Sequence, residues 1–189
     1  MTKDIIKLSA TFLGLTDVLD YLKNPVITLS TETENKIEDL ILFTNYVVRE
    51  ITKNYMPLLT EEEATSNKSC EIHFTNLSKN AIAIKNIKNG LGQKVTFNLY
   101  PTFIKVGFPE TKYMITYNYT PEKIQNIDQT LELPFGLGSE IVAYGVASEY
   151  ALSKLLYNEA DMWESKFKNS LENIKVKAGD RRFFARRLI

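Results

Sequence analysis

The chain has 189 residues, of which 44% are hydrophobic, 11% aromatic and 24% charged, a composition typical of a folded protein with a sizeable core. Its formal net charge is zero, from 23 basic and 23 acidic residues, which argues against a general nucleic-acid binder whose whole surface attracts phosphate. At this length we expect one core with an elaboration.

Charge is unevenly distributed along the chain. Residues 1–63 contain six basic and eleven acidic residues, whereas residues 175–189 contain six basic residues and a single acid, Asp180. This asymmetry suits a chain whose own copies, or a neighbouring protein, meet acid to base. Two separately solvated faces account for the charge pattern equally well.

The sequence also bears on compartment. Cys70 is the only cysteine, so no internal disulfide is expected. The segment Met1–Lys7 lacks the apolar run of a signal peptide, and no stretch approaches the roughly 20 apolar residues that cross a bilayer. We expect a soluble protein, made inside a cell, with no membrane contact.

The N-terminal region predicts a helical hairpin. Apolar residues from Leu8 to Leu22 fall at helical spacing and end before Asn24-Pro25, where proline stops a helix. A second helix is predicted to begin at Thr33-Glu34, to carry an apolar stripe from Ile37 to Tyr55, and to end at Pro57.

The middle region changes to the period of strands. Apolar and polar residues alternate in short runs between Ser69 and Thr120, and the intervening Asn89–Gly92, Tyr100–Thr102 and Gly107–Glu110 segments are typical of turns. We predict an antiparallel meander of about five short strands.

The C-terminal region returns to helix. A helix is predicted to begin at Ser139, and Asn158 is predicted to cap the next one. The four-residue repeat of alanines in the first helix forms a narrow face that lets another helix approach closely. With a tryptophan of the second helix, this face is our candidate subunit interface: Ala143, Ala147, Ala151 and Trp163.

Together these patterns predict an α+β fold. We expect a helical bundle of about four helices built from both chain ends, residues 1–64 and 133–178, with an antiparallel β region at 65–132 inserted between them. Residues 179–189 are predicted to form an extended C-terminal tail that docks on a partner.

Within one chain, the residues assemble no complete catalytic or metal constellation. His73 is the only histidine, which excludes a Cys/His metal cluster and a Ser/His/Asp arrangement. Cys70 is interpreted as a buried structural thiol. The run Glu61-Glu62-Glu63 is interpreted as a solvated turn past a helix end, with a metal or catalytic site as the alternative. We therefore predict no enzyme and no cofactor.

Two glycine segments and a tyrosine-rich strand show only weak signs of nucleotide or nucleic-acid binding. Gly90–Lys94 lacks the spacing of a P-loop, and Gly136–Gly138 lacks the third position of a dinucleotide fingerprint, so both are interpreted as turns. Tyr113, Tyr117 and Tyr119 could stack nucleic-acid bases, but few basic residues lie between them. Amphipathic aromatics on a half-exposed sheet or at an interface account for them better.

The C-terminal tail combines the residue types that dominate protein interfaces. It carries four arginines and four large apolar residues after Gly179, which would expose an apolar patch if left in water. We predict a docking arm made of Arg181, Arg182, Phe183, Phe184, Arg186, Arg187, Leu188 and Ile189. Solvated arginines, or a tail folded back on its own bundle, are the alternatives.

The order of these parts resembles the head-tail connector, or adaptor, proteins of tailed bacteriophages, which form a ring beneath the portal. The resemblance is carried by a helix ending before the strand block, a tyrosine-rich strand, a helix pair and an arginine-rich end. The matching segments are Glu50–Leu58, Tyr113–Pro121, Tyr144–Leu152 and Tyr157–Phe167.

The resemblance implies a non-enzymatic virion protein at the phage neck, made in the host bacterial cytoplasm. It implies a homo-oligomeric ring, commonly of twelve copies, that continues the DNA channel without binding DNA specifically. The arginine-rich tail is then the portal-docking arm, and the β region around Asn89 to Val106 faces the next tail or neck protein.

Other functions remain open at this point. A small nucleic-acid-binding regulator would use the basic tail and the tyrosine strand, and its binding would fall steeply with salt. A stopper or a tail terminator is another neck component that fits the same resemblance. An enzyme whose site forms between subunits is a further alternative.

Overall fold

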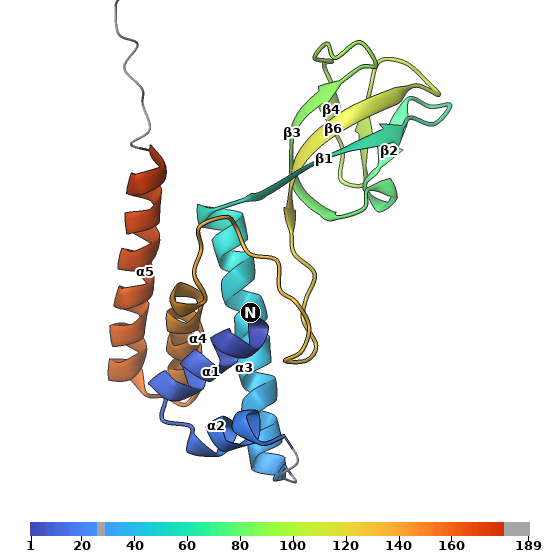
Figure 1. Cartoon of the computed structure of the whole chain (residues 1–189). Coiled ribbons are helices and arrows are strands. Elements are labelled where there is room, and N and C mark those ends of the chain that lie inside the picture. Colours follow the sequence, from blue (N-terminus) through green and yellow to red (C-terminus); the bar gives the residue numbers. More distant parts are fainter. Residues whose placement is uncertain (26–28, 180–189) are drawn as a thin grey trace, which may run out of the picture. The chain divides into compact units, whose positions relative to one another are not determined.

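The computed structural model describes residues 1–25 and 29–179, with side chains described as far as Ile174. This part of the chain contains five α-helices and six strands in two antiparallel sheets, which confirms the α+β fold class (Figure 1). The chain divides into two compact units. The β unit consists of Arg49–Glu122 and Glu132–Pro134, and the other described residues form the helical unit.

The helical unit takes helices from both ends of the chain. Its helices are α1 (Thr2–Phe12), α2 (Thr16–Lys23), α3 (Thr31–Glu50), α4 (Ser139–Ser153) and α5 (Tyr157–Gly179). Helix α4 packs against both α1 and α5 (Figure 1). Fully buried aliphatic side chains from three helices, such as Ile5, Leu40 and Val142, contribute to the core.

The first predicted helix is two helices in the structure. Gly14 has a φ of +66°, a left-handed conformation that glycine adopts without strain, and it separates α1 from α2. The Leu15 amide donates a hydrogen bond to the Ala10 carbonyl at 2.9 Å, which closes α1 before α2 begins. Periodicity alone missed this break because the apolar spacing continues across it.

Helix α3 begins slightly earlier than predicted. Ser30 accepts a hydrogen bond from the Thr33 amide through its hydroxyl at 3.2 Å, so it caps the helix in place of Thr33. After Glu50 the chain continues as a π-helical turn, Ile51–Tyr55, with the Met56 amide bonded to the Ile51 carbonyl at 2.8 Å. The following Pro57 ends the winding, as predicted.

The β unit is not the predicted meander. Its strands are β1 (Leu58–Thr65), β2 (Glu71–His73), β3 (Asn80–Lys88), β4 (Asn98–Leu99), β5 (Phe103–Lys105) and β6 (Lys112–Thr120). They form two three-stranded sheets, in the orders β1-β6-β3 and β2-β5-β4. Strand β6 therefore lies between partners distant in sequence, pairing Leu58 with Tyr119 and Ile87 with Ile115.

The β unit has its own core, to which both sheets contribute. Ile72 and Ile104 come from the β2-β5-β4 sheet, while Ile87, Ile115 and Tyr117 come from the β1-β6-β3 sheet, and all five are fully buried. The sheets cover each other because each has one apolar face.

Two boundaries differ from the sequence prediction. Strand β1, except its last residue, lies in the 1–64 segment that was expected to be helical, and Lys123–Leu131 belongs to the helical unit although 65–132 was expected to be β. The side-chain amide of Asn45 explains the second difference. It exchanges two hydrogen bonds with the Ile124 backbone, both at 2.9 Å, and so ties this loop to α3.

Candidate functional site

The structure does not test the predicted docking arm. Its eight residues, Arg181, Arg182, Phe183, Phe184, Arg186, Arg187, Leu188 and Ile189, lie outside the described residues. The helix that precedes them, α5, is described to Gly179.

The predicted subunit-interface residues are buried inside the chain. Ala143, Ala147 and Ala151 are 0% exposed, and Trp163 is 8% exposed. The small residues let α4 approach its neighbours closely, since the Ser148 hydroxyl donates to the Ala160 carbonyl of α5 at 2.9 Å. These four side chains therefore pack within one subunit and leave no surface for a second copy in this conformation.

Gly145 shows how close this packing is. A β-carbon at this position would lie 2.7 Å from Val47 Cγ1 and 3.1 Å from Phe167 Cε2, so no side chain fits without movement. The narrow face of α4 was recognised correctly from its small residues. The helix that packs against this face was not predicted, because small residues indicate close packing but not whether the neighbouring helix belongs to the same chain.

Trp163 belongs to a three-ring stack that joins α1, α4 and α5. Its ring lies 4.8 Å from the Phe12 ring and 5.8 Å from the Tyr144 ring, measured between centroids. Lys166 Nζ lies 4.3 Å from the Trp163 ring centroid, a cation–π distance. These contacts give Trp163 a structural role in the helical unit.

The run Glu61-Glu62-Glu63 lies in strand β1 and not in a solvated turn. Each carboxylate has a partner in the β unit. Lys88 Nζ lies 3.1 Å from Glu61, and Lys112 Nζ lies 2.7 Å from Glu63. Glu62 accepts hydrogen bonds from the Ser78 amide, the Ser78 hydroxyl and the Tyr117 hydroxyl, the last at 2.9 Å.

These contacts also shift the pKa of Glu62. Burial opposes its ionisation, but the hydrogen bonds from Ser78 and Tyr117 outweigh burial and hold the pKa of its carboxyl below the usual value. The alternation of the strand explains the arrangement: Glu61 and Glu63 are exposed on one face, and Glu62 is half-buried on the other.

The other chemically notable residues occupy ordinary structural places. His73 is in β2, as predicted, and Cys70 is half-buried with a φ of +61°. Tyr113 and Tyr117 are fully buried in the β core and so offer no face for base stacking. Across residues 1–25 and 29–179, no cluster of three or more His, Cys, Asp or Glu side chains could hold a metal ion.

A surface that the sequence did not reveal lies where α4 turns into α5. Four large side chains are exposed there: Leu152 is 49% exposed, Leu155 69%, Leu156 45% and Tyr157 62%. They border two adjoining hollows of about 490 Å³ and about 320 Å³ that share Tyr157 and Asn158. We call these four residues and the two hollows the turn groove.

Leu155 has an unusual backbone in the turn groove. Its φ is +61°, in the left-handed region where a helix usually ends on glycine. A leucine at this position has a conformational cost of about 1–2 kcal/mol. Its side chain gains little from the rest of the chain in return, because most of it is exposed. The Leu156 amide donates to the Ala151 carbonyl at 2.9 Å, so this backbone also closes helix α4. The exposed apolar side chains around Leu155 form a patch of the kind that partners cover.

The turn groove also contains a carboxylate that has no basic partner among the described side chains. Glu149 lines the larger hollow together with Asp161 and Glu164. Burial, and to a lesser degree the charge of Glu164, raises the pKa of the Glu149 carboxyl. Glu164 is paired with Lys168 at 2.7 Å, but no basic residue in the described part of the chain lowers the pKa of Glu149.

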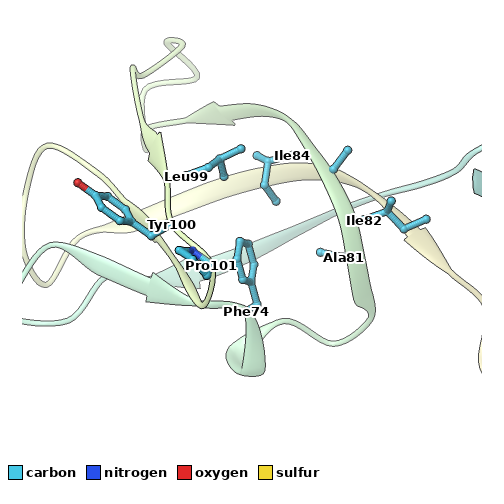
Figure 2. Close-up of a pocket in the computed structure, with 8 residues that line it drawn as sticks. Phe74, Ala81, Ile82, Ile84, Leu99, Tyr100 and Pro101 are labelled. Atoms are coloured by element: carbon cyan, nitrogen blue, oxygen red, sulfur yellow. The ribbon is translucent and has the colours of Figure 1, made fainter.

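A second apolar hollow, of about 310 Å³, lies in the β unit. Figure 2 shows it between β3, which carries Ile82 and Ile84, and the segment Leu99-Tyr100-Pro101, which begins at the last residue of β4. Strands β3 and β4 are the edge strands of their sheets, and Ile82, Leu99 and Tyr100 are 40%, 56% and 44% exposed. Exposed apolar side chains on two edge strands form a second surface suited to protein contact.

No protein-family model matches the sequence, and no curated protein matches it significantly. Among the described helices, none is both long enough and apolar enough to span a membrane.

Proposed function

We propose that this protein is a structural subunit of a phage head-tail connector, assembled as a ring under the portal and commonly of twelve copies. The exposed turn groove carries the proposal, because large apolar side chains gathered around two hollows form a surface of the kind that a partner covers. The order of helices, strand block, helix pair and arginine-rich end supports the connector class through its resemblance to that family.

In this proposal the two units have different tasks. The helices of both chain ends form the bundle of the ring wall, and the β unit, with its hollow beside β3 and β4, faces the next tail or neck protein. Residues 179–189, at the C-terminal end of the chain, serve as the portal-docking arm. A net charge of zero lets DNA pass along the channel without strong attraction to phosphate.

A mixing experiment tests the proposal. The full-length chain and a chain stopped after Lys177 are each combined with a purified portal ring, and co-sedimentation and particle mass are measured. We expect the full-length chain to bind as a ring and the shortened chain to lose most of the binding. Equal binding by both chains would show that the arm assignment is wrong, and no binding by the full-length chain would contradict the connector function.

A salt series separates this function from nucleic-acid regulation. A regulator that neutralises several phosphates loses affinity steeply as salt rises, whereas a connector subunit binds duplex DNA weakly at every salt concentration. Tight binding at low salt that falls steeply at high salt would favour the regulator. Fluorescence anisotropy with a labelled duplex measures the difference.

A further inference from the structure

The turn groove defines the chemistry of its occupant. Its rim is apolar at Leu152, Leu155, Leu156 and Tyr157, so the occupant must supply aliphatic or aromatic side chains. Half-buried Glu149 and exposed Asp161 line its larger hollow, so the occupant should also supply a cation. Nearby lysines are already engaged, since Lys154 pairs with Asp39 at 3.0 Å and Lys168 pairs with Glu164.

Residues 180–189 of this chain have that composition. They contain four arginines, two phenylalanines, a leucine and an isoleucine, with Asp180 as the only acid. Arginine suits a carboxylate in a half-buried site better than lysine, because its planar group donates two parallel hydrogen bonds and is weakly hydrated. The charges and the apolar side chains of the segment therefore both match the groove.

The length of α5 shows which copy can supply the segment. From Tyr157 to Gly179 the helix rises about 33 Å at 1.5 Å per residue, and the groove lies at its Tyr157 end. Phe184 follows Gly179 by five residues and, even fully extended, reaches about 18 Å from it. The phenylalanines of the same chain thus cannot reach the rim around Leu155, whereas those of another copy can.

We propose that the turn groove of one copy binds residues 180–189 of a second copy, with phenylalanines on the leucine rim and an arginine on Glu149. This contact is heterologous, with different surfaces meeting, and such contacts close into rings when the rotation between copies permits. The inference deepens the proposed function, because the same segment is the proposed portal arm. The neighbouring groove then holds the arm in the free protein, and the portal competes for it during assembly.

Isotope-resolved cross-linking tests the contact directly on the full chain. One protein carries Leu156→Cys and is labelled with ¹⁵N, and the other carries Phe184→Cys and is unlabelled. After mild oxidation of the mixture, we expect mass spectrometry to find a disulfide that joins a labelled to an unlabelled peptide. Wild-type protein, which has Cys70 alone, and a pair of Leu91→Cys with Phe184→Cys serve as controls, since Leu91 is 83% exposed but lies in the β unit.

Two point variants test the two kinds of contact. Leu155→Gly removes the central rim side chain and relieves its backbone strain, so we expect at least about tenfold weaker self-association with an unfolding midpoint no lower than that of the wild type. Glu149→Gln removes the charge, and we expect weaker self-association that depends less on salt. The matched control is Leu91→Gly, which should leave self-association unchanged. Light scattering over a concentration series measures the mass.

Specific outcomes would overturn the inference. A protein that stays monomeric at all concentrations, the absence of the 156–184 cross-link, or a cross-link found only within one copy would each contradict it. If Leu155→Gly does not fold, the cross-link decides. Portal binding that persists while the cross-link is absent would reject this inference alone, and a present cross-link without portal binding would reject only the connector function.

Discussion

Glutamate side chains have different surroundings in strand β1 and at the turn between α4 and α5. The three glutamates of β1 each have a partner in the β unit, and half-buried Glu62 receives hydrogen bonds from Ser78 and Tyr117. At the turn, Glu149 is also half-buried but has no basic partner among the described residues, and four large apolar side chains beside it are exposed.

This difference distinguishes carboxylates that stabilise the fold from carboxylates that are available to a binding partner. A carboxylate whose charge is balanced by partners in its own unit gains less from a second protein. A partly desolvated carboxylate beside exposed leucines costs stability in the free chain, and an arriving cation and apolar surface would recover that cost. The following variants test whether the two regions differ in this way, from the largest expected effect to the smallest.

Phe167→Ala should have the largest effect. Phe167 of α5 is 1% exposed and packs beside Gly145 of α4. Removing its ring leaves a cavity, and we expect the free energy of unfolding to fall by about 3–5 kcal/mol. Urea denaturation followed by circular dichroism measures it. Met162→Ala on the same helix, at a position that is 45% exposed, should cost less than about 0.5 kcal/mol. Equal losses for the two variants would contradict the packing described here.

Tyr117→Phe should have an intermediate effect in the β unit. The variant keeps the buried ring but removes the hydroxyl that donates to Glu62 at 2.9 Å and accepts from the Lys79 amide at 3.3 Å. We expect a loss of about 1–2 kcal/mol, because the partners lose a hydrogen bond in a partly buried site. Denaturant unfolding measures it, with Tyr46→Phe, at an exposed position on α3, as the control. An unchanged free energy of unfolding for Tyr117→Phe would show that the hydrogen bond from Tyr117 to Glu62 does not stabilise the fold.

Leu155→Gly should have a smaller effect of the opposite sign. The left-handed backbone at φ +61° favours glycine, and the leucine side chain is mostly exposed, so we expect stabilisation by about 1 kcal/mol. Thermal and urea unfolding of the monomeric fraction measure the change. A destabilised variant would indicate that Leu155 packs in its own chain, and the contrast between the turn and β1 would then disappear.

The smallest expected effects concern pH. Glu62 and Glu149 should change the free energy of unfolding with opposite signs as pH rises. The lowered pKa of Glu62 contributes stability above the ordinary glutamate pKa, and this is lost as pH falls through its folded-state pKa. The raised pKa of Glu149 means that stability is lost as pH rises from the ordinary pKa through its folded-state value.

The corresponding variants should therefore behave oppositely at neutral pH. Glu149→Gln should be more stable than the wild type, and Glu62→Gln should be less stable. Both differences should vanish at pH values where the carboxyls are protonated in the folded and unfolded chains. Unfolding curves measured from pH 3 to pH 8 provide the test, and the same sign for both variants would contradict the comparison.

Local pattern was sufficient to predict much of the secondary structure. The start of α4 at Ser139, the turn at Asn89–Gln93 and the end of the winding before Pro57 agree with the prediction, because turn residues and proline act on their immediate neighbours. The capping predictions were wrong: Gly138 precedes α4 without a side-chain cap, and Asn158 lies inside α5. The break at Gly14 and the strand character of Glu61–Glu63 were missed, since neither alters the local pattern strongly enough.

Pairing and exposure required the tertiary structure. The sequence by itself determined that the chain is α+β and that α4 has a close-packing face, because residue size and periodicity are local properties. Only the tertiary structure decided that β1 pairs with β6, that the alanine face is covered by the same chain, and that Leu155 stays exposed. Each of these depends on which distant segments meet. Those contacts are selected by the free energy of the whole fold, which no single segment determines.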